Sequence, residues 1–365
     1  MADAPLRTSL HGRHDALGAR LGPFAGWEMP LYYSSPSAEH KAVRGAAGVF
    51  DVSHMGQLEL SGAGAGEYLQ SMLTNDVSEL EPGHGQYTLM LDDDGGTIDD
   101  LIVYHLQGNH YMAVVNASNV AACRERLAER VPVDVDLVDR SPETAMLALQ
   151  GPSFEQMLAP LSSDEVWTGL EYFHAAHDTV AGVECLVART GYTGEPGVEL
   201  LCPWDAAPAL WDALVEGGAV PAGLVARDTL RLEMGYPLYG QELSRDRTPI
   251  EAGLGWACDL EGGGFAGAEV LRAQKAEGTP ERLCIFTLTE GGIPRPGHPV
   301  LRGDEPVGTV TSGTLSPTLE AGIGMAYVPS EIAGPDHDIA IDVRGKRKAA
   351  RTARRPLVHT SPTKG

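Results

Sequence analysis

The sequence lacks the features of several protein classes. It has no run of about 18 apolar residues, which a membrane-spanning helix needs, and its start lacks the apolar core of a signal peptide. Its five cysteines are far apart and never form a Cys-x-x-Cys pair, which argues against a disulfide framework and a structural zinc site. We therefore expect a cytoplasmic protein without a metal ion or a membrane segment.

Positive charge is also scarce. The chain has 27 Lys and Arg against 50 Asp and Glu, a net charge of −23, so it repels phosphate backbones and is not expected to bind nucleic acid. One basic run near the C-terminal end is either a solvated surface or a docking site for an acidic partner. Its members are Arg344, Lys346, Arg347, Lys348, Arg351, Arg354 and Arg355.

What is present is enough apolar sequence for two or three domains, because 43% of the 365 residues are hydrophobic. Predicted strands and helices follow each other without strict alternation, which favours an α+β fold over a doubly wound sheet. We expect one α+β region over residues 1–265. Short strands between Gly and Pro turns predict a small antiparallel barrel or sandwich over residues 280–360.

Three local predictions concern the N-terminal region. Residues 21–36 are rich in Gly, Pro and aromatic residues, a pattern too irregular for a helix. A helix should follow, with Ser35 as its cap, Pro36 in its first position and Gly48 at its end. Residues 48–60 then have the apolar pattern of a single strand.

The aspartate pair at 99–100 lies within a predicted strand of large apolar residues. Alternation places Asp100 on the same face as Ile98, Ile102 and Tyr104, and Asp99 on the other face. At least one carboxylate should therefore point into a covered space, where it needs a partner, a proton or a ligand. The alternative is that one aspartate closes a hairpin and the other lies at a sheet edge.

A second candidate is the segment RTGYTGEPGVEL at 189–200. Its glycines permit tight turns, and Tyr192 offers an aromatic ring. Glu199 lies between apolar neighbours in a short strand, where a carboxylate could accept a paired donor edge such as an amide N–H beside an amino group. A plain ion pair is the other interpretation.

A third candidate is the pair Arg227 and Arg231, which are four residues apart and so share one face of a predicted helix. Guanidinium groups suit carboxylates and carbonyl oxygens. Asp228 and Glu233 could equally neutralise both in a structural network. The glycines at 62, 64 and 66 suggest a dinucleotide site, but their spacing differs from Gly-x-Gly-x-x-Gly and Glu67 would repel a pyrophosphate.

Eight segments, in order along nearly the whole chain, closely resemble the aminomethyltransferase family, the T proteins of the glycine cleavage system. They are FAGWEMPLYY (24–33), VFDVSHMGQ (49–57), LTNDV (73–77), GGTIDDLIVY (95–104), ALQGP (148–152), RTGYTGEPGVEL (189–200), AGLVARDTLRLEMGYPLYGQEL (222–243) and TSGTLSP (311–317).

The resemblance implies a folate-binding α+β region of two interleaved subdomains around a central cavity, followed by a C-terminal antiparallel β-barrel. It implies a reaction on an aminomethyl group held as a thioether on the lipoyl arm of the lipoylated H protein. Tetrahydrofolate accepts the one-carbon unit as 5,10-methylenetetrahydrofolate, ammonia leaves, and the arm becomes dihydrolipoyl. No metal is implied for this step.

The resemblance also assigns roles to single residues. Asp100 matches the second aspartate of the family's pair and is the candidate catalytic carboxylate. Glu199 and Arg227 match folate-contacting positions, and Tyr192 and Met55 match positions that line the folate pocket. Arg227 would hold either the pterin carbonyl or a folate carboxylate.

Two relatives with the same fold are alternatives. The folate module of an amine demethylase would need a separate flavin-bearing partner. The folate-binding iron–sulfur cluster assembly factor carries a cysteine in its version of the segment at 236–242, and this chain has none there.

Overall fold

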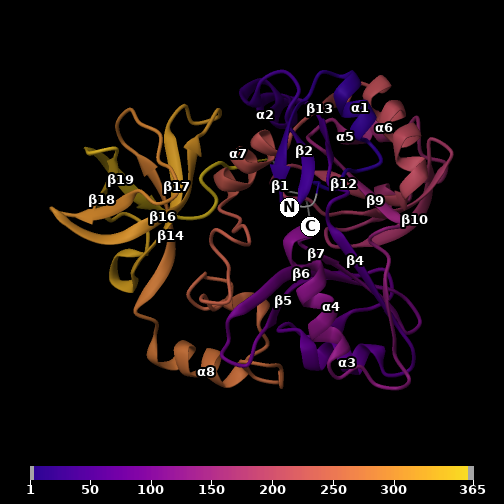
Figure 1. The fold of residues 1–365 in the computed structure, drawn as a ribbon, viewed down its shortest axis with the longest axis horizontal. Helices are drawn as coiled ribbons and strands as arrows, with labels where there is room; N and C mark the ends of the chain where they lie inside the picture. The colour runs from indigo at the N-terminus through magenta and orange to yellow at the C-terminus, as the bar shows by residue number, and fades with distance from the viewer. Residues whose placement is uncertain (1–3, 361–365) are drawn as a thin grey trace.

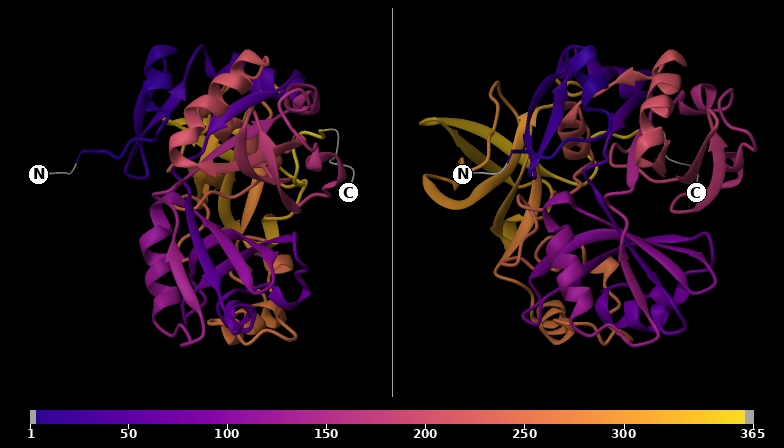
Figure 2. Two further views of the ribbon diagram at one scale, coloured as in Figure 1. Left: turned by 90° about the vertical axis from the view of Figure 1, so that its right-hand side faces the viewer. Right: turned by 45° about the vertical axis from the view of Figure 1, so that its right-hand side comes forward.

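Two sheets and a barrel are arranged around the middle of the molecule (Figures 1 and 2). The structure is a computed structural model and describes residues 4–360. Figure 1 shows the barrel on the left and the two sheets, with their helices, at the upper and lower right. None of the helices in this part of the chain is both long and apolar enough to span a bilayer.

The lower sheet is fully antiparallel, in the order β5-β6-β7-β4-β8. Its predicted hairpins are confirmed. Two helices pack on one face, where Leu69 and Cys123 enter a shared apolar cluster. The elements are β4 (Gly56–Ser61), α3 (Ala65–Met72), β5 (Gly85–Leu91), β6 (Thr97–Gln107), β7 (His110–Val115), α4 (Val120–Ala128) and β8 (Asp136–Asp139).

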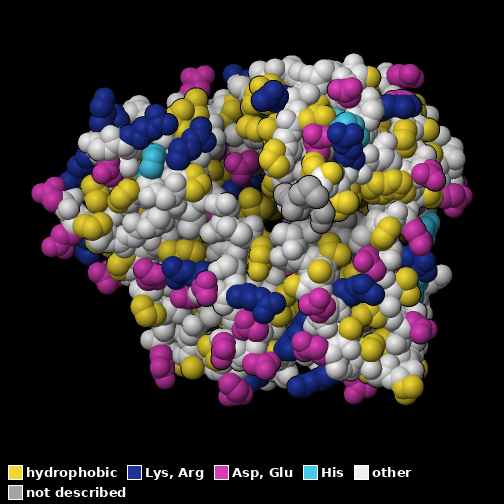
Figure 3. Space-filling view, in the orientation of Figure 1, with side chains coloured by type: hydrophobic (Ala, Val, Ile, Leu, Met, Phe, Trp, Pro, Cys, Tyr) yellow, Lys and Arg dark blue, Asp and Glu magenta, His cyan; other side chains and the backbone are white. Residues whose placement is uncertain are grey.

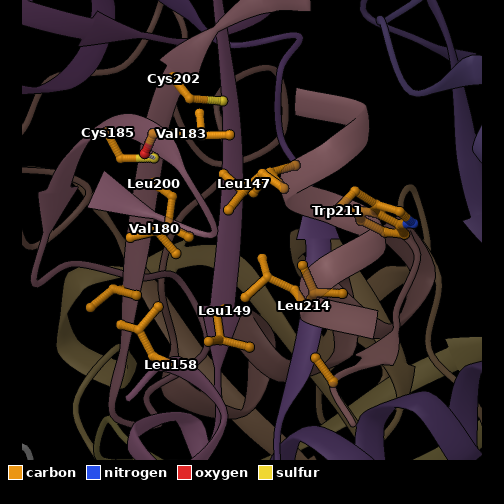
Figure 4. Packing of buried hydrophobic residues seen from close by; sticks show 14 of the residues in the cluster. Leu147, Leu149, Leu158, Val180, Val183, Cys185, Leu200, Cys202, Trp211 and Leu214 are labelled. Carbon is orange, nitrogen blue, oxygen red and sulfur yellow. Dashed lines mark hydrogen bonds between the residues drawn. The ribbon is translucent and has the colours of Figure 1, made fainter. Parts of the chain in front are cut away.

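The upper sheet has the order β10-β11-β12-β9-β3-β13. On its outer face, Trp211 and Leu214 of one helix pack towards Leu147 and Leu149 of the central strand β9 (Figure 4). The elements are β3 (Gly48–Asp51), β9 (Thr144–Gln150), α5 (Phe154–Leu158), β10 (Ala175–Val180), β11 (Val183–Ala188), β12 (Gly197–Pro203), α6 (Ala207–Glu216) and β13 (Val220–Pro221).

The single strand expected over residues 48–60 is wrong. The chain makes two strands there, and β3 belongs to the upper sheet while β4 belongs to the lower one. The Asp51 carboxylate accepts the backbone N–H of Ser53, and the Val52 carbonyl accepts that of Met55, so the chain turns between the strands. This crossing brings Met55 to the space between the sheets.

The N-terminal segment agrees with expectation except at one helix end. The Gly-, Pro- and aromatic-rich residues, where no helix is expected, form a hairpin of β1 (Arg20–Phe24) and β2 (Trp27–Tyr32), because Ala25 and Gly26 both adopt positive φ and close a two-residue turn. The helix α2 (Pro36–Gly45) begins as predicted, with the Ser35 hydroxyl accepting the Ala38 N–H, but it ends at Gly45 rather than Gly48. A short helix, α1 (His11–Ala16), precedes the hairpin.

The inner faces of the two sheets meet in one apolar cluster. Strand alternation sends Ile102 and Tyr104 of β6 into it from below, and Leu201 of β12 from above. Asp100 and Glu199 lie two residues from Ile102 and Leu201, so their side chains point to the same interior. The prediction that Asp100 shares a face of the strand with Ile98 is wrong, because a bulge in β6 places Ile98 in the apolar cluster on the opposite face.

The helix α7 (Leu224–Met234) closes one side of this interior. It ends at Gly235, whose φ of 73° is left-handed and whose Cα lies against Arg355, so a side chain would not fit.

After α8 (Ala268–Glu277), six strands close the predicted antiparallel barrel. They are β14 (Glu281–Leu288), β15 (Pro299–Arg302), β16 (Glu305–Leu315), β17 (Gly322–Pro329), β18 (Asp338–Val343) and β19 (Lys346–Ala353).

A buried carboxylate on α7 joins the barrel to the sheets. Glu233 accepts hydrogen bonds from Arg44 of α2 and from Ser316 and Thr318 of the barrel, and its Oε1 lies 3.3 Å from Nε2 of His40. Burial alone would raise the pKa of Glu233, but His40, Ser316 and Arg44 outweigh it and lower that pKa to about 2. This network fixes α7 against the barrel.

Glu233→Gln keeps the volume of the side chain and removes its charge. We expect a loss of about 3 kcal/mol at pH 7, seen as a lower thermal midpoint, because Arg44 loses one of its two buried carboxylate partners and keeps only Glu195. The pKa of Glu233 is lower in the folded chain than in the unfolded one, so its stabilisation is complete above pH 4.5 and is lost as the pH falls towards 2. The difference between variant and wild type should shrink over that range in thermal unfolding.

The matched control is Glu331→Gln, which removes an exposed ion pair with Arg302 on the barrel and should cost less than about 1 kcal/mol. Equal losses from both variants would contradict the role of Glu233.

Candidate functional site

A cavity of about 990 Å³ lies where the two sheets, α7 and the barrel meet. This volume is at the upper end of the range that small-molecule sites occupy. All five predicted site residues line it: Met55, Asp100, Tyr192, Glu199 and Arg227. They come from four separate parts of the chain, and the fold brings them together.

Asp100 projects from β6 and is held from two sides. Its Oδ2 accepts the Tyr87 hydroxyl at 2.9 Å, and its Oδ1 accepts the Asn116 side-chain amide at 3.0 Å. Burial raises the pKa of Asp100 above the usual range of an aspartate, and the two hydrogen bonds only partly oppose this. The carboxylate therefore carries a charge that is poorly solvated and fixed in direction.

Glu199 projects from β12 and is 5% exposed. Its Oε2 accepts the Thr190 hydroxyl at 2.6 Å, and Thr190 in turn meets the Tyr104 hydroxyl at 3.0 Å. Burial raises the pKa of Glu199, while the charge of Arg227 and the hydrogen bond from Thr190 lower it. No hydrogen bond to its Oε1 is found within residues 4–360, so that oxygen is available to a ligand.

Arg227 projects from the first half of α7. Its guanidinium lies 4.9 Å from the centre of the Tyr192 ring. Its Nη1 is buried and has no hydrogen-bond partner in the described part of the chain. Burial lowers the pKa of Arg227, and the charge of Glu199 opposes that shift. A buried guanidinium donor without an acceptor is costly in an empty site, so it indicates a ligand oxygen at this place.

Tyr192 and Met55 form part of the wall. The Tyr192 hydroxyl donates to the Pro237 carbonyl, and its ring stacks on Tyr236 at 5.7 Å. Gly194 in the same loop has a φ of 77° and lies against Met234, so the loop packs closely onto the end of α7. Met55 is half-buried beside His54, whose pKa burial lowers to about 4.

Arg231, the second member of the predicted arginine pair, also lines the cavity. Among the lining residues that were not expected at the site are Tyr87, Asn116 and Trp256. The predicted hairpins contained a signal for two of them. Leu89 pairs with Asp100, so Tyr87 shares its face, and extending the pairing of Ile102 with Val114 places Asn116 opposite Asp100. Trp256 lies in the short 3-10 helix η5 (Gly255–Ala257), is 68% exposed and stacks on Tyr87, and no local pattern indicated this.

The glycines at 62, 64 and 66 do not line this cavity. A Cβ at Gly62 would lie 2.0 Å from the Asp134 carbonyl, so the role of this glycine is close packing.

Within residues 4–360 no group of three or more His, Cys, Asp or Glu residues is arranged to hold a metal ion. The cavity instead combines a poorly solvated carboxylate with a buried acid and guanidinium, which suits a flat ligand that offers both donors and an acceptor.

Comparisons with known proteins agree over the whole chain. The family model of the GCVT N-terminal domain matches residues 10–262, and that of the glycine cleavage T-protein C-terminal barrel domain matches residues 281–359. An aminomethyltransferase of Anoxybacillus flavithermus is 48% identical over 96% of this chain and 98% of its own length. One from Mycobacterium leprae is 43% identical over 98% of this chain and 99% of its own length.

A solved structure is similar as well. The crystal structure of the glycine cleavage system aminomethyltransferase T from Bartonella henselae superposes with a TM-score of 0.92 at 31% identity. The match covers 99% of this chain and all of that one. These relatives favour the transferase over the assembly factor and the demethylase module. The chain belongs to the glycine cleavage T-protein family of aminomethyltransferases.

Proposed function

We propose that this chain transfers the one-carbon unit of an aminomethyl group to tetrahydrofolate. The aminomethyl group is carried as a thioether on the lipoyl arm of a lipoylated H protein, and the products are 5,10-methylenetetrahydrofolate, ammonia and dihydrolipoyl H protein. The observation that carries this proposal is the meeting of Asp100, Glu199 and Arg227 in one cavity of a family member. We place the reaction in the cytoplasm.

Glu199 and Arg227 are proposed to bind the pterin ring. A reduced pterin presents an amino group beside a ring N–H, which a carboxylate can accept as a pair, and a carbonyl oxygen next to them. The partnerless Nη1 of Arg227 supports a role as donor to that carbonyl, because Arg227 and Glu199 already influence each other's pKa across the same part of the cavity. Thr190 keeps the Glu199 carboxylate from rotating.

Asp100 is proposed to act at the reacting centre. As the carbon–sulfur bond breaks, the aminomethyl carbon becomes part of a cationic iminium, and a fixed carboxylate stabilises that positive charge. The same carboxylate can orient N5 of the folate for attack on this carbon. Tyr87 and Asn116 support both roles, since they hold the two oxygens of Asp100 before the substrate arrives.

The barrel offers a docking surface for the acidic H protein. Basic side chains gather over the barrel at the upper left of Figure 3. Within the basic run Arg344, Lys346 and Arg354 are exposed, whereas Arg347 pairs with Asp304. Arg355 is half-buried and donates to a backbone carbonyl, so it belongs to the interior. We propose that the exposed members attract the H protein in an otherwise acidic molecule.

The alternative functions make different predictions in one assay. H protein loaded with the aminomethyl group is mixed with the chain, with and without tetrahydrofolate. Release of ammonia that depends on folate supports the transferase. Folate binding without any release would support the assembly factor instead.

Asp100→Asn should lower turnover by about 10²–10⁴-fold, because the neutral amide cannot stabilise the developing cation. Binding of tetrahydrofolate, measured by calorimetry, should stay within a few-fold, since the pterin contacts are unchanged. Asp94→Asn, in the exposed turn of the same hairpin, is the control and should behave as wild type. Turnover near that of the wild type in the Asp100 variant would refute this role.

Glu199→Ala should weaken tetrahydrofolate binding by about 1.5–3 kcal/mol, the range for a hydrogen bond to a charged group. Calorimetry measures the change directly. Glu184→Ala removes an exposed glutamate from the adjacent strand β11 and should leave the affinity unchanged. Equal affinities of the two variants would reject Glu199 as the pterin anchor.

Reversal of Arg344 and Lys346 to glutamate should slow association with the H protein several-fold at low salt. The difference should fade above about 0.5 M salt, where the charges are screened. Arg124→Glu with Arg130→Glu makes the same charge change at an exposed residue of α4 and at another just after it, and serves as the control. The association rates of both double variants can be measured by stopped flow. If the two rates fall equally, the basic run is only a solvated surface.

A further inference from the structure

The carboxylate next to Asp100 has no place in the proposed reaction. Asp99 points to the opposite face of β6, towards the apolar cluster of the lower sheet, and is 0% exposed. It does not line the cavity. A carboxylate in such a place is costly unless its contacts compensate, and a neutral or apolar residue would fit the same strand more easily.

Within residues 4–360, every hydrogen bond to the Asp99 carboxylate comes from the chain between β7 and the middle of α4. Its Oδ2 accepts the backbone N–H of Asn116 at 2.9 Å and the Cys123 thiol at 3.6 Å. Its Oδ1 accepts the side-chain amides of Asn116 at 2.8 Å and Asn119 at 2.6 Å. Asp99 thus accepts two hydrogen bonds from Asn116, one from its backbone N–H and one from its side-chain amide.

Asn116 connects the two aspartates. The Nδ2 that donates to Asp99 lies 3.0 Å from Oδ1 of Asp100 and 2.9 Å from its carbonyl oxygen. Asn116 also lines the cavity. Its amide group could rotate and present an oxygen to Asp100, which would repel the carboxylate. Contact with Asp99 opposes that rotation, because Asp99 accepts hydrogen bonds and repels an amide oxygen.

We propose that Asp99 is a positioning residue for the transfer reaction: it fixes the Asn116 amide so that an N–H of this amide points at the catalytic carboxylate Asp100. This inference rests on the proposed function. Asp99 itself touches neither folate nor the aminomethyl carbon in this arrangement. Its effect on the reaction passes through Asn116.

The electrostatics of the pair agree with this arrangement. Burial and the charge of Asp100 raise the pKa of Asp99, and hydrogen bonds from Asn116 and Asn119 lower it. The Asn116 amide also lowers the pKa of Asp100, which burial raises. The other titratable groups that face the two carboxylates are Tyr87 from β5, Cys123 from α4, Tyr192 from the loop before β12, and Tyr239 from the segment after α7. The charge of Arg245 acts on Cys123 and Tyr239.

The test is a double-mutant cycle of Asp99→Asn and Asn116→Ala in the full chain, assayed with loaded H protein and tetrahydrofolate. Each single variant should lower kcat by about tenfold or more, as misplacement of a reacting group does, with tetrahydrofolate affinity within about threefold of wild type. The double variant should be no slower than the slower single variant, because both changes break the same connection.

Asn119→Ala is the matched control. Asn119 donates to the same Asp99 oxygen but has no hydrogen bond to Asp100 and does not line the cavity. Its loss should lower the thermal midpoint while kcat stays within about threefold of wild type. A purely structural role of the network would predict similar effects of Asn116→Ala and Asn119→Ala on kcat.

The pH dependence of kcat gives an independent readout. If Asp100 acts as a carboxylate, activity falls on the acidic side as Asp100 gains a proton. Asn116→Ala removes a hydrogen bond that favours the charged form, so the pKa of Asp100 rises and the acidic limb moves to higher pH. In Asn119→Ala the acidic limb of the kcat profile should stay at the pH of the wild type.

The outcomes separate this inference from the proposed function. No transfer by the wild type would overturn the function. An active wild type with additive effects in the cycle, or with equal kcat and equal acidic limbs for Asn116→Ala and Asn119→Ala, would overturn only the role of Asp99. If Asp99→Asn does not fold, the comparison of the two asparagine variants still decides.

Discussion

The alternation of side chains along β6 and β12 is the constraint on which the site depends. Each strand sends one row of residues into its own outer core and the other row into the space between the sheets. Asp100 and Glu199 both fall in the inner row, so two carboxylates face one interior. A shift of β12 by one residue would turn Glu199 into an apolar core and replace it by Val198 or Leu200, and a shift of β6 would turn Asp100 into the core of the lower sheet.

Burial in the cavity also determines how strongly the charged groups interact with a ligand. In a low dielectric, a carboxylate or guanidinium that lacks a complete set of partners interacts strongly with whatever ligand completes the set. Asp100 has a donor at each oxygen, whereas Arg227 retains a buried donor without an acceptor. Asp100 is therefore already oriented before a ligand arrives, as a catalytic group should be. Arg227 still needs an acceptor from a ligand, as a binding group does.

Much of this was predictable from the sequence, and the failures have physical reasons. The α+β class, the barrel and the hairpin carrying Asp100 follow from short-range patterns of apolar and turn residues, and the five site residues followed from resemblance to a family. The break between β3 and β4 did not, because side-chain and backbone hydrogen bonds near Asp51 and Ser53 turn a stretch whose apolar pattern is continuous. Periodicity also does not encode the bulge at Ile98, which interrupts the regular pairing within one hairpin. The place of Trp256 depends on its contact with Tyr87, which is far away in the chain.

The helix α7 explains why the barrel belongs to the site rather than merely following it in the chain. Arg227 near its start faces the part of the cavity that is proposed to bind the pterin, whereas Arg231 one turn later donates to Ser312 of the barrel at 2.7 Å. At the end of the helix Glu233 meets Ser316 and Thr318 of the barrel. Because one rigid helix carries all of these contacts, a shift of the barrel would move Arg227 relative to Glu199, which is fixed in the upper sheet. The barrel thus sets the distance between the two groups that are proposed to bind one ring.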